Sequence, residues 1–232
     1  MVWSRLRRGQ DAPGLPLPGV CGHRRHTLRT GRLLLYSLET RLDLAAALAA
    51  GSDPEAQWWL GWDKHIMTDP KVREVYVQLR PGDTDSLRRY PAVQRLLRHP
   101  VEPLSDEAVA LIGVRVDDGR YAGFAELEPD TGLIGGWLAP HARGLGLGVE
   151  LFGAAASLGH THLGLRTVRA GHEPANTASA RALAGAGFVA DDGPPRHTLR
   201  DGREVDACWL RHTAPGTISR CRAAGRQDRR NS

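Results

Sequence analysis

The chain has 232 residues, 41% of them hydrophobic, which is enough for one large domain or two small ones with a sizeable core. No apolar run approaches 18 residues, so a membrane-spanning helix is excluded, and the three cysteines have no metal-binding or redox spacing. The net charge of +5 comes from the ends, because residues 1–29 carry +5 and residues 214–232 carry +4, which leaves −4 for residues 30–213.

This charge distribution predicts a basic flexible leader over residues 1–26, one domain over residues 27–213 and a basic disordered tail over residues 214–232. Arginine-rich ends can bind nucleic acid or ribosomes, but solvated extensions without such a role are favoured. The leader lacks the apolar segment of a secretory signal. Together with the sparse cysteines, this indicates a cytoplasmic protein without a membrane partner.

The first elements of the domain are a strand and two helices. Residues 32–37 form a predicted strand, and residues 40–50 a helix that Gly51 ends. The sequence Ser52-Asp53-Pro54 starts a second helix, which carries Trp58, Trp59 and Trp62. These tryptophans suit ordinary packing or the wall of a substrate gorge. Residues 63–105 are ambiguous: residues 72–79 fit a helix or a strand, and residues 91–98 fit a short helix.

The second half of the domain has a clearer pattern. It predicts a hairpin of strands 109–116 and 121–127, a third strand over residues 133–138, and then a helix from Leu147 to about Gly159. A strand at 166–170, a helix at 176–186 and strands at 188–190 and 204–211 follow. The sequence His160-Thr161-His162 is interpreted as a loop, and the histidines show no metal spacing. This order indicates an α/β domain with a mixed, mostly antiparallel sheet and helices on both faces.

A glycine-rich turn joins the third strand to its helix. Gly144, Gly146 and Gly148 lie between Pro140, which ends the strand, and the helix that begins at Leu147. Glycine allows the backbone to approach a ligand closely, and the N-terminus of a helix attracts anions. The turn therefore predicts a phosphate or pyrophosphate site.

Three known phosphate-binding motifs can be compared with this stretch. The Walker turn requires Gly-Lys followed by Ser or Thr, and no lysine is present here. The dinucleotide fingerprint Gly-x-Gly-x-x-Gly is not matched, because position 149 is valine. The third form, Arg/Gln-x-x-Gly-x-Gly/Ala, is matched by Arg143, Gly146 and Gly148, although this composition predicts about one such match by chance.

That third form is the coenzyme A turn of the GNAT superfamily of acyl-CoA N-acyltransferases, which this stretch resembles. The preceding residues 135–140 are similar to the branch that contains the ribosomal-protein alanine and serine N-acetyltransferases, as are residues 28–35. The sequence Asn176-Thr177-Ala178-Ser179, followed by Gly187-Phe188, resembles the second cofactor segment of that branch. The resemblance implies a single GNAT-like domain whose sheet has splayed strands at the acyl-CoA site.

The resemblance also implies roles for individual residues. The N–H groups of Leu145 to Gly148 would hold the pyrophosphate of acetyl-CoA, with Arg143 contributing charge. The backbone of Trp137 and Leu138 would pair with the pantetheine arm. Asn176 would hydrogen-bond the arm, and Ser179 would bind the coenzyme and assist the departing thiolate. The residues expected to bind the cofactor are Trp137, Leu138, Arg143, Gly144, Leu145, Gly146, Leu147, Gly148, Asn176 and Ser179. Asn176 and Ser179 can equally be a helix cap and its partner.

The general base is less well defined by the sequence. The serine-acetylating branch uses a glutamate four residues before the turn glycine of the final hairpin, and counting back from Gly202 gives Thr198, which cannot act as a base. Glu126 and Glu128 are the alternative bases, and strand alternation places them on the same side; of the two, Glu126 is the predicted catalytic residue. A water chain could also take the proton, so the base remains open at this stage.

The sequence therefore predicts an N-acetyltransferase that moves an acetyl group from acetyl-CoA to a primary amine, either a small molecule or a protein N-terminus, by direct attack in a ternary complex. The alternatives are a catalytically weak acyl-CoA-binding module, and a ribosome- or nucleic-acid-associated protein that uses its arginine-rich ends. No metal is expected. The identity of the amine and the formation of a homodimer stay open.

Overall fold

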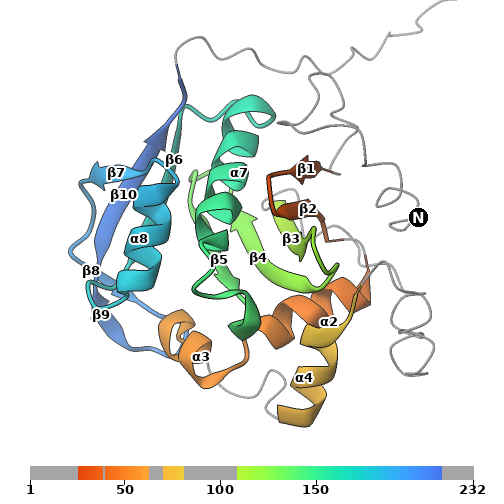
Figure 1. Ribbon diagram of the computed structural model, residues 1–232. Helices are drawn as coiled ribbons and strands as arrows, with labels where there is room; N and C mark the ends of the chain where they lie inside the picture. The colour runs from red at the N-terminus through yellow and green to blue at the C-terminus, as the bar shows by residue number, and fades with distance from the viewer. Residues whose placement is uncertain (1–25, 39, 63–69, 81–108, 216–232) are drawn as a thin grey trace, which may run out of the picture.

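The computed structural model describes residues 26–38, 40–62, 70–80 and 109–215, which form two sheets joined side by side (Figure 1). The larger sheet is antiparallel throughout and runs in the order β1-β2-β3-β4-β5. Its strands are β1 (Thr27–Arg29), β2 (Leu33–Ser37), β3 (Val109–Arg115), β4 (Tyr121–Leu127) and β5 (Ile134–Leu138).

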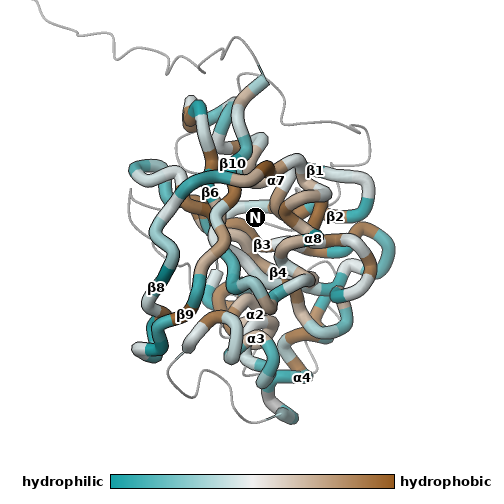
Figure 2. Tube along the Cα trace, turned by 90° about the vertical axis from the view of Figure 1, so that its left-hand side faces the viewer, coloured by the Kyte–Doolittle hydropathy of each residue, from teal (hydrophilic) through white to brown (hydrophobic). Residues whose placement is uncertain are grey.

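The second sheet continues the first across one point of contact. It runs in the order β6-β10-β7, with β6 (Thr167–His172), β7 (Val189–Asp191) and β10 (Cys208–Thr213) all antiparallel. A parallel bridge between Leu133 and Arg169 connects β5 to β6. A separate hairpin, β8 (Arg196–Thr198) with β9 (Glu204–Asp206), is largely hydrophilic (Figure 2).

Helices cover both faces of the larger sheet. Leu111 of β3 belongs to a buried cluster with Leu147 and Leu151 of α7, whereas its neighbour Ile112 belongs to a cluster with Leu42 of α2. Because successive strand residues face opposite sides, α7 and α2 lie on opposite faces. The helices are α2 (Arg41–Ala50), α3 (Pro54–Leu60), α4 (Pro70–Gln78), α7 (Leu147–Thr161) and α8 (Thr177–Gly185), with a short 3₁₀ turn, η2 (Pro140–Ala142).

Buried hydrogen bonds fix α2 on the sheet. The side chain of Asp43 is 2% exposed and accepts hydrogen bonds from the hydroxyls of Tyr36 on β2 (2.9 Å) and Tyr121 on β4 (2.8 Å). The same carboxylate completes a capping box with Thr40 at the start of the helix. Since a buried charge is costly unless it is hydrogen-bonded, these contacts define the position of α2 and of the α3 segment that follows.

The mixed sheet with helices on both faces is confirmed, one open assignment is settled and two local predictions are corrected. Residues 70–78, which fitted a helix or a strand, are helical. His160 and Thr161 belong to the last turn of α7 rather than to a loop. The expected strand 204–211 is two strands, because β9 pairs with β8 and β10 pairs with β6 and β7. The helix predicted over residues 91–98 lies outside the described residues, as do most of the leader and tail.

Candidate active site

The glycine turn lies between β5 and α7, where the sequence predicted it. Gly144 (φ +72°) and Gly146 (φ +75°) are both left-handed, and Gly146 is the N-cap of α7. The first N–H groups of a helix have no partner within it, so those of Leu147 and Gly148 point out of the start of α7. The turn and helix thus present donors and a positive dipole end to an anion.

At Gly148, unlike at Gly144 and Gly146, it is close packing rather than a left-handed backbone that requires a glycine. A Cβ at this position would lie 3.0 Å from the Cβ of Ala182 on α8. The absence of a side chain therefore lets α7 and α8 pack closely. A Cβ at Gly144, in contrast, would meet no heavy atom within 4 Å, so the turn itself is open on that side.

The strands β5 and β6 belong to separate sheets, and among the described residues they pair only at the bridge between Leu133 and Arg169. The N–H of Glu128 donates to the C=O of Leu133 (2.9 Å) and the N–H of Ala139 donates to the C=O of Ala122 (2.8 Å), so odd-numbered residues of β5 bond to β4. The backbone groups of Gly136 and Leu138 must then face β6. From the sequence, we expected the backbone groups of both Trp137 and Leu138 to face a ligand. The alternation allows this for Leu138 but not for Trp137, whose backbone groups face β4.

The side chain of Trp137 is part of the packing between sheet and helices. It stacks on Phe124 with ring centres 4.6 Å apart and meets Trp62 edge-on at 4.8 Å. Its Nε1 donates a hydrogen bond of 2.9 Å to the carbonyl of Ala47 on α2. Trp62 thus belongs to the packed aromatic group, whereas Trp58 on α3 is 56% exposed and lies under the guanidinium of Arg203.

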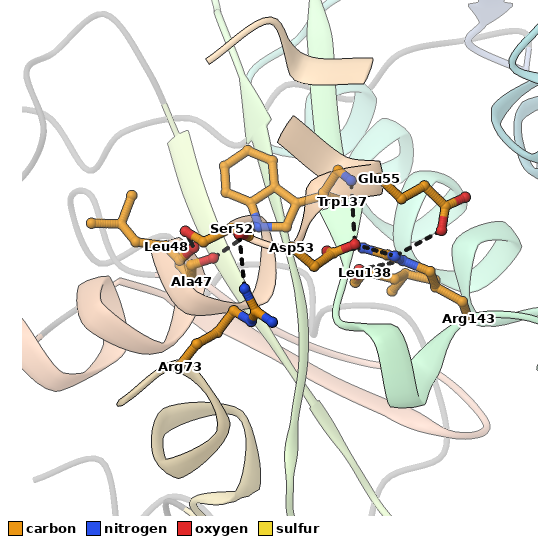
Figure 3. A network of polar contacts seen from close by, with 10 residues as sticks. Ala47, Leu48, Ser52, Asp53, Glu55, Arg73, Trp137, Leu138 and Arg143 are labelled. Atoms are coloured by element: carbon orange, nitrogen blue, oxygen red, sulfur yellow. Dashed lines mark hydrogen bonds and ion pairs between the residues drawn. The ribbon is translucent and has the colours of Figure 1, made fainter. Parts of the chain in front are cut away.

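Arg143 joins the glycine turn to the start of α3 (Figure 3). Its Nε donates to the carbonyl of Leu138 (3.0 Å), and its Nη1 and Nη2 pair with Asp53 at 2.9 and 2.5 Å. Nη1 also contacts Glu55 at 3.1 Å. All three guanidinium nitrogens therefore have protein partners in this structure, where the sequence suggested a pyrophosphate contact.

Asp53 has two roles in this contact, because it is also the N-cap of α3 and accepts from the N–H of Ala56. Burial by itself would raise the pKa of Asp53, but the hydrogen bond and charge of Arg143, with backbone N–H groups, outweigh it and lower the pKa below its ordinary value. The carboxylate is thus ionised at neutral pH and holds the turn to the helix.

A second arginine, which the sequence patterns did not single out, lies against the same turn. Nη1 of Arg32 donates to the carbonyl of Leu145 (2.6 Å), and its Nε pairs with Glu150 at 2.5 Å. Its Nη2 lies 3.4 Å from the position of a Cβ on Gly146. The residues are more than 110 positions apart in the chain, so no local pattern could have indicated this contact.

Asn176 and Ser179 form the start of α8. Asn176 is the N-cap, and its Oδ1 accepts a 3.0 Å hydrogen bond from the N–H of Ser179. The capping interpretation is therefore correct. The hydroxyl of Ser179 has no hydrogen-bond partner among the described residues, and the residue is partly exposed. The predicted catalytic role of Ser179 remains compatible with this arrangement.

Glu126 lies on the face of β4 that carries Phe124, directly opposite Gly135 of β5. Burial raises the pKa of Glu126 above its ordinary value, Arg200 opposes this shift, and Glu128 adds to it. A Cβ on Gly135 would meet no heavy atom within 4 Å, so there is open space beside the carboxylate. Glu128 is exposed and accepts a hydrogen bond from Thr131, which distinguishes the two glutamates.

Comparisons with known proteins agree with this geometry. Residues 32–189 match the model of the acetyltransferase (GNAT) domain. A comparison with proteins of curated function gave no match. Among the described residues, no helix is long and apolar enough to cross a membrane.

Several solved structures share the fold at low sequence identity. A ribosomal-protein α-N-acetyltransferase (RimL) in complex with coenzyme A is 15% identical, with a TM-score of 0.55 over 81% of this chain and 98% of that chain. A spermidine N-acetyltransferase from Vibrio cholerae in complex with coenzyme A and spermine is also 15% identical, with a TM-score of 0.54 over 78% and 95% of the two chains. A GNAT-family acetyltransferase from Bacillus anthracis is 14% identical, with a TM-score of 0.53 over 81% and 98%.

Proposed function

The chain belongs to the GNAT family of acetyltransferases, and from this premise we propose that it transfers the acetyl group of acetyl-CoA directly to a primary amine in a ternary complex. The observation that carries the proposal is the open backbone edge of β5 leading into the left-handed glycine turn at the start of α7. A thioester with a long amide-containing arm and a pyrophosphate suits those two features in succession. The spermidine and ribosomal-protein enzymes of similar fold both use amines as acceptors.

In this proposal the coenzyme follows the chain from strand to helix. The backbone groups of Gly136 and the N–H of Leu138 pair with the pantetheine arm between β5 and β6, since the carbonyl of Leu138 already accepts from Nε of Arg143. The N–H groups of Leu145 to Gly148 hold the pyrophosphate at the positive end of α7. The thioester then lies where the two strands no longer pair, within reach of the face that carries Glu126 and of the start of α8.

The chemistry requires one base and one stabilised leaving group. The amine nitrogen attacks the thioester carbonyl, the new N–C bond forms, and the C–S bond breaks to release the coenzyme thiolate. Glu126 accepts the amine proton, since a raised pKa makes a carboxylate a better base at neutral pH. The hydroxyl of Ser179 donates to the departing thiolate. Positioning of the two substrates supplies much of the remaining acceleration.

Calorimetric titration of acetyl-CoA tests the placement of the coenzyme. Gly146→Ala puts a methyl group where the pyrophosphate approaches, and we expect it to weaken binding by about tenfold or more. Gly202→Ala is the control, because Gly202 is also left-handed (φ +85°) but lies in the β8–β9 turn. A Cβ at Gly202 meets no heavy atom within 4 Å, whereas a Cβ at Gly146 lies 3.4 Å from Nη2 of Arg32. Equal affinities in the two variants would contradict this placement.

Release of free thiol with a panel of amines tests the reaction itself. We expect turnover with at least one polyamine or peptide N-terminus, and a loss of turnover when the acceptor amine is blocked. Binding of acetyl-CoA without thiol release for any amine would contradict catalysis and favour a module that only binds acyl-CoA.

A further inference from the structure

Two arginines contact the coenzyme turn, and they differ in how much of their charge is already neutralised. Arg143 pairs with two carboxylates, Asp53 and Glu55, so its cluster has an excess of negative charge. Among the residues that the structure describes, Arg32 pairs with Glu150 alone, and its side chain is 55% exposed. A pyrophosphate that approaches the turn is therefore repelled less near Arg32 than near Arg143.

The contacts of Arg32 also hold its guanidinium in a fixed place. Nε bonds to Glu150 and Nη1 to the carbonyl of Leu145, which leaves Nη2 as the group nearest to Gly146. Glu150 is held in turn by the backbone N–H of Arg32 (2.9 Å) and by the hydroxyl of Thr30. Such a pre-oriented planar donor suits a phosphate oxygen, because little side-chain freedom is lost on binding.

We propose that Arg32, from the β1–β2 connection, is the cation that binds the coenzyme pyrophosphate, with Nη2 donating to a phosphate oxygen above Gly146. The proposal rests on the function proposed above, and it reassigns the charge that the turn motif attributes to Arg143. Glu150 then acts as a positioning residue, since it holds the guanidinium beside the turn. Its carboxylate, at the start of α7, would itself repel a phosphate if Arg32 did not neutralise it.

The test compares two acetyl donors, acetyl-CoA, which has the pyrophosphate, and S-acetylpantetheine, which lacks it. In Arg32→Gln we expect kcat/KM for acetyl-CoA to fall about tenfold, the value typical of one charge-assisted hydrogen bond. The same variant should leave kcat/KM for S-acetylpantetheine unchanged, because that donor has the thioester and the arm but no phosphate. Arg32→Lys should recover part of the loss. Arg196→Gln is the matched control, since Arg196 is also exposed and pairs with a single carboxylate, Glu204.

A second variant separates the loss of a cation from the exposure of an anion. Arg32→Gln combined with Glu150→Gln removes both charges, and we expect acetyl-CoA to remain weakly bound. Affinity restored to the wild-type value by the second substitution would overturn the proposal, because Arg32 would then only shield Glu150. An equal loss with both donors would also overturn it and would make Arg32 purely structural.

The outcomes separate this proposal from the one on which it rests. If wild-type protein binds acetyl-CoA and Gly146→Ala weakens binding, the coenzyme placement stands, and unchanged affinity in Arg32→Gln overturns the role of Arg32 alone. If wild-type protein does not bind acetyl-CoA, both proposals are overturned.

Discussion

The ion pair between Arg143 and Asp53 can be removed without removing the helix cap that Asp53 provides. Asparagine is as good an N-cap as aspartate, so Asp53→Asn keeps the side-chain acceptor for the N–H of Ala56 and loses only the charge. The guanidinium of Arg143 then retains Glu55 at 3.1 Å and the carbonyl of Leu138. The variant therefore isolates the electrostatic link between the coenzyme turn and α3.

The size of the effect follows from the partial burial of the pair. The side chain of Asp53 is 10% exposed and that of Arg143 is 27% exposed. Exposed pairs contribute about 0.2–1 kcal/mol, whereas breaking a buried pair costs about 3–5 kcal/mol. We expect an intermediate loss in the free energy of unfolding of about 1–2 kcal/mol, because Glu55 compensates in part. For a domain of this size that corresponds to a Tm lower by about 2–8 °C.

A double-mutant cycle with Arg143→Gln measures the interaction. Chemical denaturation of the wild type, the two single variants and the double variant should give a coupling of about 1 kcal/mol or more. The exposed pair of Arg196 with Glu204, whose side chains are 59% and 64% exposed, is the reference, and its coupling should be below about 0.5 kcal/mol. A coupling for Arg143 with Asp53 no larger than this reference would refute the reasoning.

Three further predictions concern catalysis and pH. Glu126→Gln should lower kcat by about 100-fold or more with little change in acetyl-CoA affinity, and a pH–rate profile should lose its rise on the acid side. Ser179→Ala should lower kcat more than it weakens acetyl-CoA binding, since the N–H of Ser179 still binds the cap. Burial, together with the neighbouring His160, lowers the pKa of His212 below its ordinary value of 6.5. The unfolded chain therefore binds protons first as pH falls through 6.5, so Tm should decrease from pH 7.5 to pH 5, and His212→Gln should flatten this dependence.

The parts of the fold that the sequence predicted are those determined by local pattern. The alternation of residues 109–127 and the helical spacing from Leu147 each identify an element that buries one face, and the structure confirms them. The position of the glycine turn between a strand and a helix was predicted from spacing, and the structure adds that Gly144 and Gly146 are left-handed. Residues 70–78 were ambiguous because their few apolar positions fit both periods.

What the sequence did not reveal depends on contacts between distant segments. His160 lies in α7 and not in a loop because its Nε2 meets Nδ1 of His212 at 2.8 Å and its Nδ1 meets the carbonyl of Leu165. These partners satisfy the ring at a site that is 4% exposed. The separation of β9 from β10 likewise follows from the pairing of β9 with β8, which no pattern within residues 204–211 indicates.

The two arginines show why a motif predicts backbone more securely than side-chain roles. A glycine at position 146 can adopt the left-handed conformation whatever surrounds it, so the shape of the backbone there depends little on distant residues. A guanidinium reaches several ångströms from its Cα, and its partner is determined by whichever carboxylates the fold brings near. Arg143 lies in the turn motif but faces two carboxylates from α3, whereas Arg32 lies outside the motif and faces the turn. The contacts between distant segments therefore determine which arginine is positioned to meet a ligand at the glycine turn. If the proposal for Arg32 is correct, the variants of Arg32 and Arg143 should differ in how strongly their acetyl-CoA kinetics depend on the pyrophosphate.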